Sequence, residues 1–213
     1  PELETAAYAG ATIGQLLDLP RAPLARVEEL QVPGPAGLLP ARLYAPSTER
    51  LPVLLYLHGA RWDVTGSAAR VRRMGSLGFS VLAIDYRGFG QSTDTLPSET
   101  LANEDARAAW DWLAQRHPGL PRYVFGHSLG SAIAVQLASQ VDDESGVLVE
   151  GSFTSLPDVV SSFKWGWLPV GPLITQRFDA ASRVDKLGSP LLVVHGGSDR
   201  LIDSVVAWGD EQA

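Results

Sequence analysis

Short, continuous apolar runs recur along this chain of 213 residues, and they constrain its fold more than any other feature. The clearest are residues 52–58 (PVLLYLH), 80–85 (SVLAID) and 190–195 (PLLVVH), with shorter runs at 122–126 and 146–150. A continuous apolar run without a polar face is typical of a strand that is buried on both sides in a parallel sheet. The runs therefore predict a sheet whose two faces are both covered.

Helical patterns separate these runs and supply the expected cover. The longest spans residues 98–116, where alanines and Trp110 recur at spacings of three and four, and Pro118 ends it. Shorter helices are expected at 1–25, 67–77, 129–139 and 203–212. Two early strands are expected at 25–31 and 40–45, with a Pro/Gly turn at 33–37. This alternation predicts a single α/β domain over residues 1–213, with a mostly parallel sheet and helices on both faces.

Composition excludes several classes of binding partner and several kinds of site chemistry. The net charge of −7 and the pI of about 5.0 argue against nucleic acid or an anionic membrane as a partner. The absence of cysteine excludes disulfides, thiolate metal sites and a cysteine nucleophile. No group of histidines and carboxylates has metal spacing, so we expect neither metal nor cofactor.

The chain carries no obvious membrane or export signal. Its longest apolar stretch, near residues 51–57, is far shorter than the roughly 20 residues that span a bilayer. No basic and apolar pattern with a cleavage site opens the sequence, which favours a cytoplasmic location over export. An export signal removed together with the start of the chain would leave the same sequence. The sequence therefore does not determine the cellular compartment.

Residues 126–130 (GHSLG) form a G-x-S-x-G pattern, whose meaning depends on its surroundings. An apolar strand leads into it through Tyr123, and a helical pattern begins at Leu129. A strand–serine–helix turn lifts the serine hydroxyl above the sheet, and the glycines relieve crowding around a strained backbone. The alternative is a tight glycine turn with an ordinary serine. The surrounding strand and helix favour Ser128 as a nucleophile.

At this motif the chain resembles the α/β-hydrolase superfamily, and three further segments agree in order. Residues 57–60 (LHGA) follow a central strand, where the family has its oxyanion loop. Residues 85–92 (DYRGFGQS) are similar to the family's D-x-R-G-x-G-x-S, and residues 195–200 (HGGSDR) to its H-G-x-x-D. The resemblance covers about residues 40–202 and implies an α/β-hydrolase fold.

Within the superfamily, the chain is most similar to monoacylglycerol-lipase-like and serine-aminopeptidase-like hydrolases. The lead over residues 20–56 also resembles that of hormone-sensitive-lipase-type esterases. The H-G-G-G of those esterases is replaced here by H-G-A-R at residues 58–61.

The resemblance implies a division of roles in acyl transfer. Ser128 would attack an ester carbonyl and form an acyl-enzyme. Backbone N–H groups of Leu129 and of either Ala60 or Arg61 would stabilise the oxyanion. Asp199 would orient the base, and the bland alternative for it is a solvated turn residue. Asp203 is the second candidate for this acid.

The base itself is not among the printed residues, because no histidine follows Asp199. The four histidines have other expected roles: His58 supports the oxyanion loop, His127 points away from the nucleophile, His195 supports the last strand, and His117 is a surface cation at a helix end. The family has a further strand and a histidine-bearing turn where Ile202 here meets Asp203. We expect residues to be missing at that junction. The alternative is a true deletion, which would leave an inactive fold or one completed by a partner's strand.

Residues 155–181 break the strand–helix rhythm and are rich in Trp, Phe, Pro and Gly. We expect a short cap there, after the sixth strand. Trp165 and Trp167, and Trp62 beside the oxyanion loop, are expected to line a substrate pocket. The competing interpretation is that these side chains only cover the sheet.

The expected function is a serine hydrolase that cleaves carboxylic esters of small molecules. A peptidase or amidase and an acyltransferase remain alternatives with the same chemistry. A binding protein without catalytic activity is the alternative from another class, because fold alone does not imply activity. A homodimer is left open.

Overall fold

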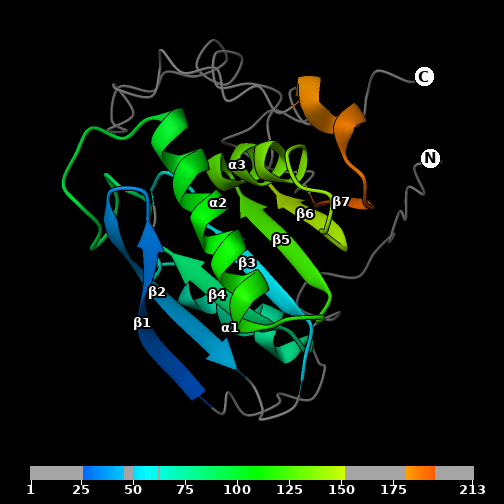
Figure 1. Cartoon of the computed structure of the whole chain (residues 1–213), viewed down its shortest axis with the longest axis horizontal. Helices are drawn as coiled ribbons and strands as arrows, with labels where there is room; N and C mark the ends of the chain where they lie inside the picture. The colour runs from blue at the N-terminus through cyan, green and yellow to red at the C-terminus, as the bar shows by residue number, and fades with distance from the viewer. Residues whose placement is uncertain (1–25, 46–49, 62, 152–180, 195–213) are drawn as a thin grey trace.

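The computed structural model describes residues 26–45, 50–61, 63–151 and 181–194 (Figure 1). Strands and helices alternate through these residues as the sequence predicts. The strands are β1 (Arg26–Gly34), β2 (Gly37–Ala45), β3 (Val53–Leu57), β4 (Ser80–Ile84), β5 (Arg122–His127), β6 (Gly146–Glu150) and β7 (Leu191–Val194). The helices are α1 (Ala68–Ser76), α2 (Glu99–Arg116), α3 (Leu129–Ala138) and the 3-10 helix η2 (Ala181–Lys186).

Several predictions fall outside these residues. They are the helices at 1–25 and 203–212 and, up to residue 180, the cap at 155–181. The cap's last predicted residue, Ala181, begins η2, a short helix that the sequence pattern does not indicate.

The seven described strands form one sheet in the order β1-β2-β4-β3-β5-β6-β7. From β4 to β7 all neighbours are parallel, whereas β2 runs antiparallel to both β1 and β4. Leu55 in the middle of β3 is in register with Leu82 of β4 and Val124 of β5. The predicted mostly parallel sheet is therefore confirmed. Because β3, β5 and β6 are parallel, the loops after them lie along the same edge of the sheet.

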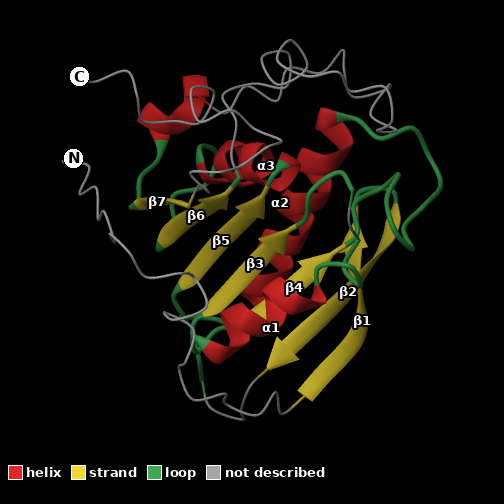
Figure 2. Ribbon diagram, turned by 180° about the vertical axis from the view of Figure 1, so that it is seen from behind, coloured by secondary structure: helices red, strands yellow, loops and turns green. Residues whose placement is uncertain are grey.

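Helices cover both faces of this sheet, as predicted. The expected burial on both sides is wrong for β7, where Leu192 and Val194 are exposed. Helices α2 and α3 lie in front of the sheet in Figure 1, and α1 lies on the opposite face, nearer the viewer in Figure 2. All five residues of β3 are buried, and they divide between two cores. Leu55 packs in the core that contains Trp110 of α2, and Tyr56 packs in the core that contains Val71 of α1. Strand periodicity produces this division, since successive side chains point to opposite faces.

Strands β1 and β2 form a hairpin, and each is longer than the sequence predicts. Gly34 is paired with Gly37, so only Pro35 and Ala36 form the turn that was expected over 33–37. Pro33 fits within β1 because β1 is an edge strand, where a missing N–H need not cost a ladder hydrogen bond. Gly37 has a φ of +135°, which a residue with a side chain rarely adopts.

Helix α2 begins with a side-chain cap and buries the predicted face. The Ser98 hydroxyl accepts a hydrogen bond from the Leu101 N–H at 3.2 Å. The predicted apolar face is buried, and its members are Ala102, Ala106, Ala109, Trp110 and Leu113. Asp105 is buried on α2 as well, which the apolar pattern does not predict.

Asp105 is buried because it pairs with Arg87 in the loop after β4. Arg87 donates to this carboxylate from its main-chain N–H and from Nε, each at 2.8 Å. The Arg87 Nη2 also donates to Glu104 Oε2 at 2.6 Å. Burial raises the pKa of Asp105, although its hydrogen bonds and charge contact with Arg87 oppose the rise. The pair thus holds the 85–92 loop against α2. Asp105 depends on Arg87 to compensate for the cost of burying its carboxylate.

Replacing Arg87 with methionine should destabilise the fold strongly. The variant leaves the Asp105 side chain, 0% exposed, without its charged partner, and such a loss typically costs about 3–5 kcal/mol. Urea unfolding of the purified protein measures the change. Arg107→Met is the matched control, because Arg107 pairs with Asp111 on the surface of the same helix and should lose at most about 1 kcal/mol. Equal losses in the two variants would contradict this account.

Candidate active site

Ser128 lies at the sharp turn between β5 and α3. Its φ and ψ are 53° and −120°, and among the described residues no other side-chain-bearing residue has a positive φ. A non-glycine residue in such a region carries strain on the order of 1–3 kcal/mol. Strand, strained serine and helix follow one another as the G-x-S-x-G pattern predicts.

Two glycines make this turn sterically feasible. A side chain at Gly126 would place its first carbon 2.2 Å from the Gly130 carbonyl oxygen. A side chain at Gly130 would place it 2.1 Å from the carbonyl oxygen of Leu57, at the end of β3. Neither position therefore has room for a Cβ. The glycines of the motif are required by close backbone approach, which is the role that the sequence assigns to them.

Hydrogen bonds on both sides of Ser128 hold it in place. Its N–H donates to the carbonyl oxygen of Glu150, the last residue of β6, at 2.9 Å. Its carbonyl oxygen accepts from the Ser131 N–H at 2.8 Å. The Ser131 hydroxyl donates to the Gly126 carbonyl at 3.1 Å and also lies 3.3 Å from the Glu150 carbonyl. The elbow is thus fixed to the end of the neighbouring strand.

The predicted oxyanion segment lies against this elbow. A first side-chain carbon on Gly59 would be only 3.1 Å from the Ser128 Cβ. Ala60 and Arg61 follow directly, Ala60 partly buried and Arg61 exposed. Leu129 is the first residue of α3, where a helix leaves its N–H groups without an intrahelical acceptor. The structure therefore brings together the segments of Ser128, Leu129 and Ala60.

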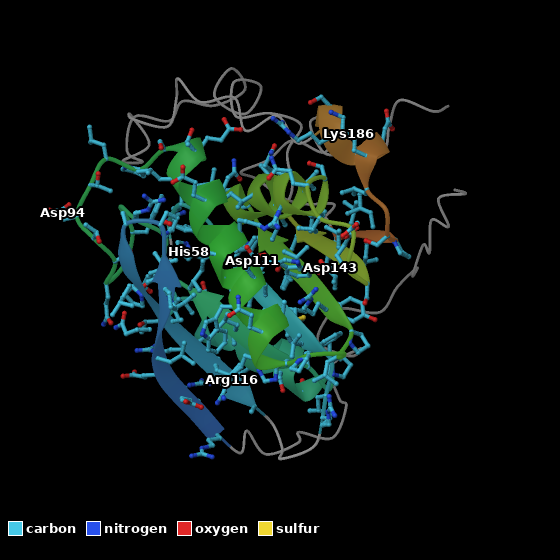
Figure 3. The ribbon with its side chains drawn as sticks, in the orientation of Figure 1. His58, Asp94, Asp111, Arg116, Asp143 and Lys186 are labelled. Carbon is cyan, nitrogen blue, oxygen red and sulfur yellow. The ribbon has the colours of Figure 1, made fainter. Side chains whose placement is uncertain are left out.

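His58 supports the oxyanion segment from within the fold (Figure 3). It is fully buried, and its Nδ1 lies 2.9 Å from the Gly59 carbonyl oxygen. Its own carbonyl accepts from the Tyr86 hydroxyl at 3.2 Å. Burial lowers the pKa of His58, although the Gly59 hydrogen bond and the Asp85 carboxylate oppose that shift. His58 is therefore neutral at pH 7, with Nδ1 as the donor to Gly59.

Asp85 closes the neighbouring loop around its carboxylate. Its Oδ1 accepts from the Val64 N–H at 2.8 Å, and its Oδ2 accepts from the Gln91 N–H at 3.1 Å. The same Oδ1 lies 3.7 Å from His58 Nε2. At Gly90, whose φ is +54°, any Cβ would overlap this carboxylate. The D-x-R-G-x-G-x-S segment therefore shapes the loop beside the oxyanion segment.

The prediction for His117 is wrong. It is half-buried at the end of α2, and burial lowers its pKa, with Arg116 adding to the shift. His117 is thus uncharged at pH 7 and cannot be the expected cation. His127 is paired in register with Glu150, and it lies two residues after Phe125, which packs in the α1-side core. Strand alternation places His127 toward the α1 face.

Other predicted site residues lie outside the described part of the chain. They are Trp62, Trp165, Trp167, His195, Asp199 and Asp203. Within the described ranges, no cluster of three or more His, Cys, Asp or Glu side chains could hold a metal ion.

Sequence reasoning missed Arg70 and Glu150. Arg70 of α1 donates to the Glu150 carboxylate through Nε at 2.9 Å and Nη2 at 3.3 Å. The only hint in the sequence is that the apolar run GVLVE ends in a charged residue. Its partner lies 80 residues away and cannot be found from the pattern.

Comparison with known proteins agrees with this geometry. Residues 48–179 match the serine aminopeptidase S33 family, which is more than half of the chain. The chain belongs to this family. Its fold is therefore that of the α/β hydrolases, as the sequence motifs predict.

Individual curated proteins and solved structures are similar to this chain as well. It is 34% identical over 158 residues to the uncharacterized protein Rv2307c of Mycobacterium tuberculosis, covering 73% of this chain and 55% of that protein. It is 31% identical over 170 residues to the lysophosphatidylserine lipase ABHD12 of Danio rerio, covering 71% and 44%. The chain thus spans about half the length of these relatives. A solved esterase of Pyrobaculum calidifontis superposes with a TM-score of 0.56 at 29% identity, covering 63% of this chain and 47% of the esterase.

Among the described residues, no helix is both long enough and apolar enough to span a membrane.

Acidification should destabilise this S33 domain partly through His58. The pKa of folded His58 lies below its ordinary value of 6.5, so only the unfolded chain takes up the proton just below pH 6.5. The contribution of His58 to the free energy of unfolding should therefore be fully present above that pH, and it should fall as the pH decreases below it. We expect a smaller fall from pH 7.5 to 5.5 in His58→Asn, measured by urea unfolding. His117→Asn reports the share of His117, whose pKa is lowered too. An unchanged pH slope in His58→Asn would contradict the prediction.

Proposed function

We propose that this protein is a serine hydrolase that cleaves carboxylic esters through an acyl-enzyme on Ser128. The observation that carries the proposal is the strained backbone of Ser128, whose φ is +53°. Such strain persists only where the surroundings impose it, and it is frequent at catalytic residues. Here hydrogen bonds to the Glu150 carbonyl and from the Ser131 N–H hold Ser128, and Gly126 and Gly130 leave room for the close backbone approach.

The expected reaction has two halves. The Ser128 hydroxyl attacks the ester carbonyl while a base removes its proton, and the carbonyl oxygen becomes an oxyanion. N–H groups of Leu129 and of Ala60 or Arg61 stabilise that charge, and each such donor is typically worth about 10²–10³ in rate. The tetrahedral intermediate collapses, and the alcohol leaves with the proton held by the base. Water then attacks the acyl-enzyme by the same route and releases the acid.

The base and its orienting acid belong to this proposal as well. Asp199 is the proposed acid. The base is a histidine outside the printed residues, because none of the printed histidines follows Asp199 and His58 is fully buried. Residues missing between Ile202 and Asp203 would supply it. An intact mass clearly above 22.8 kDa, with peptides that contain a new histidine, is the expected finding.

We infer the substrate class from the relatives and the predicted cap. The ABHD12 relatives are named lysophosphatidylserine lipases, which favours esters with a single long acyl chain. The aromatic side chains of Trp62, Trp165 and Trp167 are suited to contact such a chain. Small-molecule acyl esters are therefore the proposed substrates, with no metal or cofactor required.

Peptide or amide hydrolysis is the second candidate. The family description, serine aminopeptidase, supports it, and the same serine chemistry cleaves both bonds. Matched ester and amide substrates with one acyl group separate the two candidates, since a dedicated peptidase should retain substantial turnover on the amide.

Ser128→Ala should reduce hydrolysis of p-nitrophenyl esters to background and abolish labelling by a fluorophosphonate probe. The reason is that only an activated serine hydroxyl forms the covalent adduct. Ser139→Ala is the matched control, because Ser139 follows the far end of α3 and its hydroxyl donates to the Gln136 carbonyl. Retained turnover or labelling in Ser128→Ala would exclude Ser128 as the nucleophile. Absence of both in the parent protein would favour a binding protein without catalytic activity.

Asp199→Asn should lower kcat on the order of 10⁴-fold, the loss seen when a triad acid can no longer hold the correct tautomer. Asp203→Asn is the paired variant and should change kcat far less. Steady-state kinetics on one ester, with circular dichroism to verify folding, makes the comparison. If Asp203→Asn were the more damaging change, the acid would be Asp203.

A further inference from the structure

An ion pair on the α1 face of the sheet lies directly behind the elbow. Arg70 of α1 holds both carboxylate oxygens of Glu150, with Nε to Oε2 at 2.9 Å and Nη2 to Oε1 at 3.3 Å. This two-point contact fixes the orientation of both side chains more strictly than a single contact would. None of the acyl-transfer steps above uses either residue.

Glu150 connects this pair to the nucleophile through its own backbone. Its side chain faces α1, while its carbonyl oxygen accepts the Ser128 N–H at 2.9 Å. Glu150 is also paired in register with His127 on one side and Val194 on the other. A shift of Glu150 would therefore move the hydrogen-bond acceptor that keeps Ser128 at its positive φ.

Arg70 connects the pair to the oxyanion segment. That segment, residues 58–61, continues into a turn in which Asp63 Oδ1 accepts the Gly66 N–H at 2.6 Å. The Ser67 N–H donates to the Asp63 carbonyl at 3.0 Å, and α1 begins at the next residue. Arg70 lies in the first turn of α1. The position of Arg70 is therefore coupled to that of the loop that precedes α1.

We propose that Arg70 and Glu150 are positioning residues that set the spacing between the oxyanion donors and Ser128. The inference rests on the proposed function, since spacing matters only if acyl transfer takes place there. Neither residue touches the substrate. The pair joins α1, which follows the oxyanion loop, to the end of β6, which holds the elbow.

Partial exposure separates this role from a purely structural one. The Arg70 and Glu150 side chains are 35% and 34% exposed, and ion pairs this accessible to water contribute little to stability. Catalysis is far more sensitive, because displacing reacting groups by about 1 Å can cost roughly 10²-fold in rate. Loss of the pair should therefore affect turnover more than unfolding.

Arg70→Met tests the proposal in the complete protein. We expect kcat per titrated active site to fall about tenfold, with KM within twofold and with a urea midpoint close to that of the parent. Labelling by a fluorophosphonate should slow by a similar factor. A trifluoromethyl ketone, which mimics the tetrahedral intermediate, should bind more weakly by that factor as well. Arg107→Met is the control, because it breaks an ion pair on α2 and should leave kcat unchanged.

Rescue makes the test specific. Arg70→Lys retains the charge but not the two-point contact, and it should recover only part of the rate. Exchange of the two residues, Arg70→Glu with Glu150→Arg, should recover more of the rate than either single change. Equal labelling rates in Arg70→Met and the parent would overturn the inference while leaving Ser128 as the nucleophile. A parent protein that the probe does not label would instead overturn the proposed function, and this inference with it.

Discussion

The backbone of Ser128 is the constraint on which the rest of the site depends. A serine with a φ of +53° is strained, and it is held there only because its neighbours leave no alternative. The lack of a side chain at Gly126 lets the first turn of α3 pack against the end of β5, and the lack of one at Gly130 lets α3 approach the end of β3. The strand order then places β5 between β3 and β6. The oxyanion segment thus follows one neighbouring strand, and the Glu150 carbonyl ends the other.

Polar pairs fix the loops at this edge of the sheet. On the side of α2, Arg87 and Asp105 anchor the loop after β4. Asp85 closes that loop around its carboxylate. On the side of α1, Arg70 holds Glu150. Burial differs between the two sides. Asp105 is inaccessible to solvent, so its pair stabilises the fold. The side chains of the Arg70 pair are 35% and 34% exposed, and this pair is suited to hold position.

Sequence patterns predict features that lie within one or two neighbouring elements. They miss contacts between residues that are far apart in the chain. The parallel sheet, the buried face of α2 and the Ser128 elbow follow from short patterns within one or two elements. The Arg87–Asp105 and Arg70–Glu150 pairs join residues 18 and 80 positions apart, and no periodicity relates them. His117 was misassigned because its exposure depends on how the end of α2 packs. Asp199, the tryptophans and the cap at 155–181 remain predictions.

Strain and stability oppose one another at the elbow. Glycine at position 128 would adopt the same backbone angles at little cost, but it would have no hydroxyl to attack an ester. Serine retains the nucleophile and retains the strain as well. The surrounding contacts must therefore compensate for that strain before they contribute to catalysis. Those contacts are backbone hydrogen bonds from β6 and α3 and the close packing of two glycines, all formed when the sheet forms. The backbone geometry of Ser128 is consequently formed together with the core of the fold. The loops that complete the site then pack beside Ser128.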